Sequence, residues 1–306
     1  MNQLEKQSDK VKRVYKNIQR ERLRKVLSYC CVFLLLASCA GIFYKTVFLK
    51  TVHNQELAQQ KNLYYEENTD TENAEAPVLP GDVQNRFGAL YQQNPDICGW
   101  ITMLNTQIDN PVYKPPADDP DFYLTHNAQK KKSSYGAIYL DARITLEENP
   151  KTLILYGHNM NDGSMFHDLT RYNSLSFYKE NPVFSFNTLQ EEGSWKIFSV
   201  FAANTRSVHG EVFDYQRTVF KDDGDFLTFA GQLRERSLID TGIDVKDSDQ
   251  ILILSTCSYE HPDFRTVVAA RKVRQEESPV TETESARLVE NPVRPEVCAG
   301  CRHGGT

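Results

Sequence analysis

The chain is 306 residues long but lacks the cysteine pattern of a disulfide-stabilised protein. Three of its seven cysteines lie in one apolar run and four lie elsewhere: Cys30, Cys31 and Cys39, and then Cys98, Cys257, Cys298 and Cys301. The sequence leaves open a Cys98–Cys257 bridge, although nothing in it favours one. Cys298 and Cys301 form a lone C-x-x-C without the second pair of a structural zinc site, which makes them a weak signal for metal or redox chemistry.

The chain also lacks the excess of positive charge that is typical of nucleic-acid-binding proteins. Its net charge is −6, and no basic patch with interleaved aromatic residues occurs outside the N-terminus. We therefore expect no nucleic-acid partner. The positive charge is concentrated in residues 1–25, which hold nine Lys or Arg against three acidic residues.

An uncharged apolar run of nineteen residues, 26–44, follows this basic segment. It is long enough to cross a bilayer core. Basic residues on its N-terminal side predict a single-pass membrane anchor with the N-terminus inside and the rest of the chain outside the cell. A cleaved signal peptide would have a shorter basic region and an A-x-A-like site, and neither is clear. Residues 36–39 (Leu-Ala-Ser-Cys) resemble a bacterial lipobox, which leaves lipidation at Cys39 open, but the apolar run through Phe43 and the long basic lead favour an uncleaved anchor.

Composition divides the rest of the chain. We expect a basic cytoplasmic segment (1–25), a transmembrane anchor (26–44), an extracellular spacer (45–82) that could be helical over 51–66, one folded domain (83–274) and a disordered tail (275–306). The tail prediction rests on its content of Pro, Glu and Gly.

The folded domain consists mainly of short strands. Two of them, 152–156 and 251–254, are runs of mostly aliphatic residues without helical spacing, which is typical of strands buried on both faces. We also expect strands at 99–103, 108–113, 122–124, 136–140, 184–186, 193–203 and 266–270, and helices at 82–93, 166–172, 175–179 and 223–236. This pattern predicts a mostly β fold with added helices (α+β), in which a closed β-barrel carries one long helical insertion.

Three residues at strand ends suggest a catalytic site. Cys257 stands where the strand 251–257 leaves the core, Arg265 faces it if the next strand returns as a hairpin, and His158 directly follows the strand 152–156. A guanidinium beside a thiol favours the thiolate, and a Cys–His pair with a nearby cation suits acyl transfer. The alternative is that Cys257 is a small buried hydrophobe and His158 a loop residue. His126, His167, His209 and His261 are less suitable because none follows a buried strand directly.

A family resemblance rests on the segments 155–159 (Leu-Tyr-Gly-His-Asn) and 254–257 (Leu-Ser-Thr-Cys), on Arg265, and on the supporting stretches 94–101, 136–141 and 255–260. In this order, behind a basic anchor, they resemble the sortases, the cysteine transpeptidases of Gram-positive cell surfaces, and in particular class B. The resemblance runs from about residue 83 to 273. It implies an eight-stranded sortase barrel with N-terminal helices and a helix in the long loop before the cysteine strand.

The resemblance also implies roles. Cys257 would be the nucleophile, His158 the general acid and base, and Arg265 the group that stabilises the substrate or the oxyanion. The enzyme would cleave a C-terminal sorting signal of surface proteins, NPxTN-like or (S/P)PxTG-like, after its Thr. An amine of a peptidoglycan precursor or a pilin would then accept the acyl group. Because this exchange of acyl partners is close to isoenergetic, no metal or other cofactor is expected.

Substrate-binding residues are less clearly marked. Ser255, Thr256 and Tyr259 are candidates to line the groove. The chain departs from class B at Pro120, which stands where an Asn is often found, so a substrate contact through that Asn is lost or reassigned. Two other functions stay open: a secreted cysteine hydrolase that passes the acyl group to water, and a non-catalytic surface module.

Overall fold

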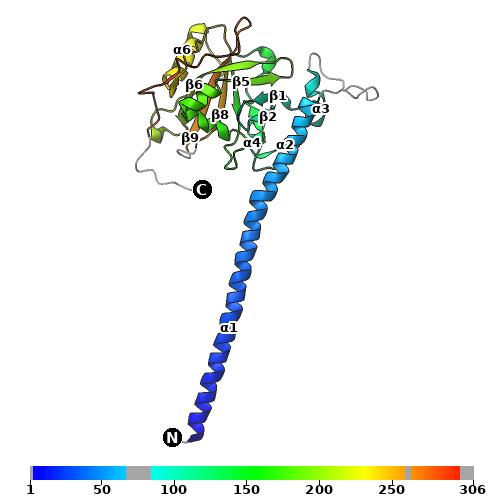
Figure 1. The fold of residues 1–306 in the computed structure, drawn as a ribbon, viewed down its shortest axis with the longest axis vertical. Coiled ribbons are helices and arrows are strands. Elements are labelled where there is room, and N and C mark those ends of the chain that lie inside the picture. The colour runs from blue at the N-terminus through cyan, green and yellow to red at the C-terminus, as the bar shows by residue number, and fades with distance from the viewer. Residues whose placement is uncertain (1–2, 67–83, 259–262, 297–306) are drawn as a thin grey trace, which may run out of the picture. The chain divides into compact units, whose positions relative to one another are not determined.

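The computed structural model describes residues 3–66, 84–258 and 263–296, and the chain divides into two compact units, Met1–Ala58 and Gln59–Thr306. The first unit is helical: α1 (Gln3–Phe43) leads through a π-helical turn, η1 (Tyr44–Phe48), into the first part of α2 (Leu49–Tyr65) (Figure 1). The last residues of α2, from Gln59 on, belong to the second unit. This helical stretch contains an 18-residue window of mean hydropathy 2.3, so it is long and apolar enough to cross a membrane.

The second unit is built on a closed barrel of eight strands in the order β1-β2-β3-β4-β8-β9-β6-β5. The strands are β1 (Ile97–Thr102), β2 (Asp109–Tyr113), β3 (Ile138–Leu140), β4 (Thr152–Tyr156), β5 (Val183–Thr188), β6 (Ser194–Asn204), β8 (Ile251–Cys257) and β9 (Phe264–Lys272). The β2–β3 and β4–β8 pairs are parallel, and the other pairs are antiparallel. The predicted fold class, a closed eight-stranded barrel with added helices, is confirmed.

The aliphatic runs of β4 and β8 form a fully buried part of the barrel wall. Residues 152–155 of β4 and 251–254 of β8 are buried on both faces. A strand buried on both faces needs a neighbour on each edge, because a buried backbone N–H or C=O without a hydrogen-bond partner costs free energy. β8 therefore pairs with β4 on one edge and with β9 on the other.

Short helices connect and cover the strands. They are η2 (Asn85–Phe87), α3 (Gly88–Gln93), α4 (Phe122–Thr125), η3 (Leu146–Glu148), η4 (His167–Asn173), α5 (Leu175–Glu180), η5 (Ser207–His209) and α6 (Asp223–Glu235). In Figure 1, α6 (yellow) lies in the excursion between β6 and β8, where a helix was predicted. Asp222 begins α6 by accepting a hydrogen bond from the backbone of Asp225.

The segment 122–124 is helical, so the prediction of a strand there is wrong. The turn at Asp119–Asp121 starts a helical turn through the bonds Phe122 N to Asp119 O and Leu124 N to Asp121 O. Tyr123 is buried by this geometry, and its hydroxyl donates to Asp96 at 2.6 Å. Aromatic residues favour strands locally, but the tertiary contacts of Tyr123 decide the conformation.

The folded unit begins earlier than the sequence predicts. The last turns of α2, expected to be part of a spacer, pack on the barrel through Tyr64. The Tyr64 ring stacks on Trp100 with centroids 4.2 Å apart and planes 6° apart, and its hydroxyl accepts a hydrogen bond from Asn187. Gln60 donates to the hydroxyl of Tyr113. Residues 67–83 of the expected spacer lie outside the described residues.

The segment 275–296 is ordered on the barrel, which corrects the prediction of a disordered tail for these residues. Near its start, Glu277 binds Arg271 and Lys196. Farther along, β10 (Arg287–Leu288) pairs with β7 (Ile239–Asp240). We call residues 275–296 the C-terminal strap. The Cys298 and Cys301 pair lies outside the described residues.

Candidate active site

Three adjacent strands bring Cys257, His158 and Arg265 to the same end of the barrel. β4 and β8 are parallel, with Tyr156 beside Ser255. His158 and Cys257 each come two residues later, so they follow the same end of the two adjacent strands. β9 runs antiparallel to β8, with Arg265 directly opposite Cys257. Cys257 therefore lies on the middle strand, with His158 on one side and Arg265 on the other, as the hairpin prediction required.

Cys257 is accessible. It is a free thiol, and it is the residue of β8 that is exposed, whereas the six residues before it are buried. Its backbone carbonyl accepts a hydrogen bond from Nδ2 of Asn159 at 2.8 Å, and Oδ1 of Asn159 lies 3.0 Å from Nδ1 of His167. Asn159 and His167 therefore hold the backbone of Cys257. Asn159 could have been found from the sequence because it directly follows His158.

His158 is half-buried and oriented by the backbone. Its Nε2 lies 2.7 Å from the carbonyl oxygen of Leu124, which can only accept. Nε2 therefore carries the proton of the neutral ring, and Nδ1 is the nitrogen that can take up another. The backbone carbonyl of His158 accepts from Phe166 at 2.9 Å. The contact with Leu124 holds the ring in one tautomer, and the bond from Phe166 fixes the backbone that carries it.

Arg265 is half-buried, and its Nη1 donates to the carbonyl oxygen of Phe264 at 3.0 Å. Tyr215, from the excursion between β6 and β8, lies within electrostatic range of both Arg265 and Cys257. Burial raises the pKa of the Tyr215 phenol, so it stays protonated and can donate a hydrogen bond beside the thiol.

Two of the residues predicted to line the substrate groove, Ser255 and Thr256, are buried. Ser255 and Thr256 are each 2% exposed. The Ser255 hydroxyl is 2.9 Å from that of Tyr215, and the Thr256 hydroxyl donates to the carbonyl of Gly157 at 2.7 Å. Thr256 thus joins the ends of β4 and β8. A direct contact of either side chain with substrate stays a prediction, and Tyr259 and His261 lie outside the described residues.

A cavity of about 380 Å³ lies beside this end of the barrel. It is lined by Pro120, Asp121, Tyr139, Asp141, Ala142, Arg143, Tyr156 and Gln216. The cavity reaches the end of β4 at Tyr156, two residues before His158, and the charge of Cys257 contributes to the electrostatic environment of the Tyr139 phenol. Pro120, the position at which the sequence departs from class B, is one of the residues that line this cavity. Of these residues, sequence reasoning singled out only Pro120.

The cavity wall is a hydrogen-bonded network centred on Asp141. Arg143 binds both carboxylate oxygens, at 2.9 and 2.8 Å, and the Tyr156 hydroxyl donates to Oδ2 at 2.9 Å. Burial opposes ionisation of Asp141, but the hydrogen bonds from Arg143 and Tyr156 outweigh it and lower the pKa of that carboxyl. Nε2 of Gln216 donates to the Tyr156 hydroxyl at 2.8 Å. The wall is therefore charged, rigid and polar.

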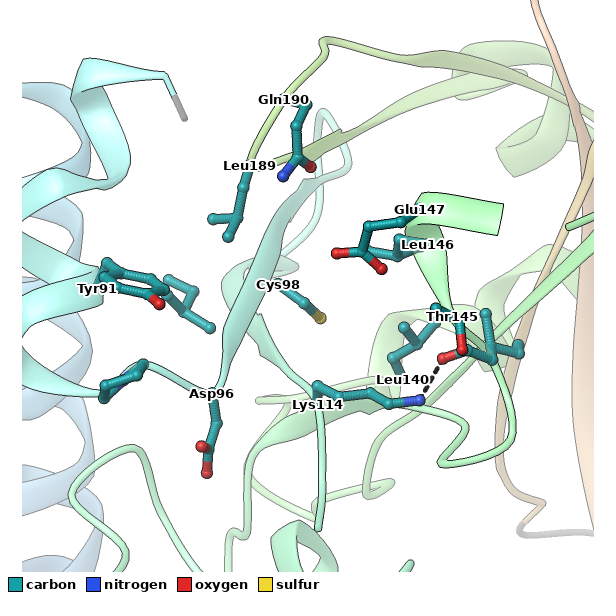
Figure 2. Close-up of a pocket in the computed structure, with 13 residues that line it drawn as sticks. Tyr91, Asp96, Cys98, Lys114, Leu140, Thr145, Leu146, Glu147, Leu189 and Gln190 are labelled. Carbon is teal, nitrogen blue, oxygen red and sulfur yellow. Dashed lines mark hydrogen bonds between the residues drawn. The ribbon is translucent and has the colours of Figure 1, made fainter. Parts of the chain in front are cut away.

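A second cavity, of about 310 Å³, surrounds Cys98 and shares no lining residue with the first. Figure 2 shows the Cys98 sulfur pointing into it from β1, with Lys114 beside it. Burial raises the pKa of the Cys98 thiol to about 12, so this cysteine is a poor nucleophile. Cys98 and Cys257 are both free, so the bridge that the sequence left open does not form.

Comparison with known proteins agrees with this geometry. The family description "Sortase domain" matches residues 101–273. A sortase B of Listeria monocytogenes is 33% identical over 208 residues, 68% of this chain and 79% of the relative.

Solved structures agree as well. A sortase B from B. anthracis, in complex with AAEK1, is similar with a TM-score of 0.62 and 31% identity, covering 75% of this chain and 100% of that one. A Staphylococcus aureus sortase B–substrate complex has a TM-score of 0.63 at 26% identity, covering 74% and 99%. With a family match over more than half its length and an exposed cysteine between a histidine and an arginine, the chain belongs to the sortase family of cysteine transpeptidases.

Proposed function

We propose that this sortase cleaves the C-terminal sorting signal of surface proteins after its Thr and transfers the acyl group to a cell-wall or pilin amine. The observation that carries the proposal is the exposed Cys257 on β8, with His158 following the adjacent β4 and Arg265 opposite on β9. These residues supply a nucleophile, an acid–base group and a fixed cation, which acyl transfer needs.

The reaction follows from these positions. The sulfur of Cys257 attacks the carbonyl carbon after the Thr, and the oxyanion of the tetrahedral intermediate develops beside Arg265. His158, protonated on both nitrogens, gives a proton to the leaving amine as the C–N bond breaks, and a thioester remains. The acceptor amine then attacks the thioester, His158 takes up its proton, and the C–S bond breaks to release the new amide and the thiolate of Cys257, with His158 again protonated on both nitrogens.

Arg265 suits its role because of its shape as well as its charge. A guanidinium presents several N–H donors in a plane and stays protonated at any physiological pH. One of them is used to bind the carbonyl of Phe264, which fixes the direction of the others. A lysine at this position would be a single point charge on a flexible stem, so we expect Arg265→Lys to lose activity.

The cavity lined by Asp141, Tyr156 and Gln216 supports a groove for the signal beside Cys257. The proposed signals are NPxTN-like or (S/P)PxTG-like. The solved complex of a similar S. aureus sortase B with its substrate supports peptide binding on this fold. The acceptor would be an amine of a peptidoglycan precursor or a pilin.

We also propose that the catalytic domain lies outside the cell on a membrane anchor. The support is the apolar window in the N-terminal helical stretch and the basic residues that precede it. In this arrangement residues 1–25 lie in the cytoplasm, and the anchor either stays uncleaved or is replaced by a lipid on Cys39.

The test uses the full chain in a nonionic detergent, a panel of sorting-signal peptides and an added amine, followed by mass spectrometry. The expected result is a thioester on Cys257 and an amine-ligated peptide, both lost in Cys257→Ala, while His158→Ala and Arg265→Lys lose the ligated product. Cys98→Ala is the matched control and keeps full activity, because that thiol is buried. Release of acid alone would indicate a hydrolase, and the absence of any adduct would reject the proposal in favour of a non-catalytic module.

A further inference from the structure

A buried histidine outside the catalytic three lies behind Arg265. His209 ends the short helix η5, and its side chain is 0% exposed. Its Nε2 lies 3.2 Å from Oδ2 of Asp263, and because a carboxylate oxygen only accepts, His209 is the donor. Its ring meets the Phe264 ring edge-on, with centroids 5.2 Å apart and planes 88° apart. His209 therefore contacts both residues that immediately precede Arg265.

Phe264 binds the Arg265 side chain directly, and Asp263 anchors the same stretch of backbone. The carbonyl oxygen of Phe264 accepts from Nη1 of Arg265 and from the backbone of Ser258, each at 3.0 Å. The carbonyl oxygen of Asp263 accepts from both the backbone and the hydroxyl of Thr205, each at 2.8 Å. A rotation of the Phe264 peptide would break the bonds from Arg265 and Ser258 to its carbonyl oxygen. The guanidinium would then move, and β8 and β9 would separate at the Cys257–Arg265 end.

The C-terminal strap reaches this same histidine. The backbone N–H of Glu296 donates to the carbonyl oxygen of His209 at 2.9 Å, and that of Val293 donates to Glu235 at 3.1 Å. The strap lies beyond residues 101–273, which the sortase domain description matches. The contact with His209 is thus supplied by a part of the chain outside the family domain.

We propose that His209 is a positioning residue for Arg265, and that the end of the C-terminal strap holds His209 in place. His209 fixes Asp263 and Phe264, the Phe264 carbonyl fixes the guanidinium, and the guanidinium is thereby held beside the sulfur of Cys257. That Arg265 takes part in catalysis rests on the proposed function. Whether its guanidinium lies beside the sulfur of Cys257 can be measured without any sorting-signal peptide.

The probe is a pair of thiol reagents of similar size, the anion iodoacetate and the neutral iodoacetamide. Both attack the same thiolate, so the ratio of their rates at Cys257 cancels the fraction of thiolate present and reports the positive charge beside the sulfur. The full chain in nonionic detergent is treated with each reagent, and the peptide that contains Cys257 is quantified by mass spectrometry. Other cysteines do not interfere because they lie on other peptides.

We expect Arg265→Ala to lower this ratio about threefold or more, since a unit charge is removed next to the thiolate. His209→Ala should lower it toward the same value, and the double variant should equal Arg265→Ala alone, because His209 acts through Arg265. His209→Gln keeps an N–H donor in reach of Asp263 and should recover most of the ratio. Val208→Ala, an exposed neighbour on η5, should leave it unchanged.

The strap is tested by a matched pair at Glu296. Glu296→Pro removes the backbone N–H that binds His209, whereas Glu296→Ala keeps it. The ratio should fall in the first variant and stay at the wild-type value in the second. Melting curves run in parallel confirm that each ratio is measured on folded protein, and His209→Gln and Glu296→Pro stay informative if His209→Ala does not fold.

Each outcome decides a separate point. If Arg265→Ala lowers the ratio and His209→Ala does not, His209 is not a positioning residue. If His209→Ala lowers the ratio further in the Arg265→Ala background, it acts on Cys257 by another route, and the proposal is wrong. An unchanged ratio in Glu296→Pro would show that the C-terminal strap does not hold His209 in place. If Arg265→Ala itself has no effect, the role of Arg265 in the proposed function fails instead.

Discussion

Replacing Glu277 with Gln should destabilise the catalytic domain by detaching the C-terminal strap from the barrel. The Glu277 carboxylate accepts from Arg271 at 2.5 and 2.8 Å and from Nζ of Lys196 at 2.7 Å. The side chain of Arg271 is 1% exposed and that of Lys196 is 6% exposed. Glutamine keeps the size of the side chain but leaves two buried cations without their shared counter-ion.

The structure sets the size of the effect. Removing one partner of a buried ion pair costs about 3–5 kcal/mol. Two facts reduce this figure here: Glu277 is itself 27% exposed, and Arg271 keeps a bond of 2.8 Å to the carbonyl of Asp244 and a carboxylate of Asp249 at 4.0 Å. We therefore expect a loss of about 2–3 kcal/mol. For a domain of this size that corresponds to a fall in Tm of about 4–12 °C.

The assay is thermal and urea unfolding followed by tryptophan fluorescence. The chain has two tryptophans, Trp100 and Trp195, and both are buried in the barrel, so the signal reports the catalytic domain alone. Glu276→Gln, at the exposed neighbouring position, is the matched control and should melt like the wild type. If Glu277→Gln also melts like the wild type, the strap is not held by this charge cluster.

The same pair of proteins gives a pH dependence with a definite sign. Hydrogen bonds from Arg271, opposed by burial and aided by Lys196, lower the pKa of Glu277 from its ordinary value of 4.5. A lowered pKa means that the carboxylate stabilises the folded state fully above 4.5, and that this contribution is lost as pH falls below it. The stability difference between wild type and Glu277→Gln should be constant near neutral pH and shrink below 4.5. A difference that stays the same down to pH 3 would contradict this account.

Three further substitutions test other contacts by the same unfolding assay. Tyr64→Ala removes the ring stacked on Trp100 and should cost about 3–4 kcal/mol. Lys114→Met breaks the bonds from the ammonium to three backbone carbonyls in the turn 141–144, and should cost about 2 kcal/mol and speed amide exchange there. Thr256→Val leaves a buried carbonyl at the end of β4 unsatisfied, should cost about 1–3 kcal/mol, and should slow thioester formation on Cys257.

Each of these has a matched control. Asn62→Ala lies on the exposed face of the same helix as Tyr64, and Lys131→Met removes an exposed ammonium; both should be close to wild type. Thr256→Ser keeps the hydroxyl that binds Gly157 and should keep both stability and rate. Equal losses in a variant and its control would show that the named contact is not responsible.

The barrel, and the juxtaposition of Cys257, His158 and Arg265 at one end of it, could be predicted because their signals are local. An aliphatic run ending in Cys257, a returning strand starting near Arg265 and a second buried run ending before His158 each mark a strand and its end. Once the two buried strands are neighbours, the observed register brings all three residues together. The resemblance to sortases then supplied the roles.

The packed end of α2 and the C-terminal strap could not be predicted because their partners are distant in sequence. Tyr64 is an ordinary helix residue until Trp100 and Asn187 are placed against it. Glu277 sits in a segment whose composition is typical of disorder, but its partner Lys196 is 81 residues away. The cavity wall around Asp141 could not be predicted for the same reason, because Gln216, which binds Tyr156, is 60 residues away from it in the chain.

The parallel pairing of β4 with β8 also determines when the proposed Cys–His pair can form during synthesis of the chain. Thr256 and Gly157, whose bond closes this pair, are 99 residues apart in the chain. Contacts of such separation form late and slowly, because the entropy of closing a long loop must be lost first. His158 therefore emerges from the ribosome long before Cys257 exists, and the two meet only when the barrel closes. The proposed Cys–His pair is therefore assembled only when the β4–β8 pairing is complete.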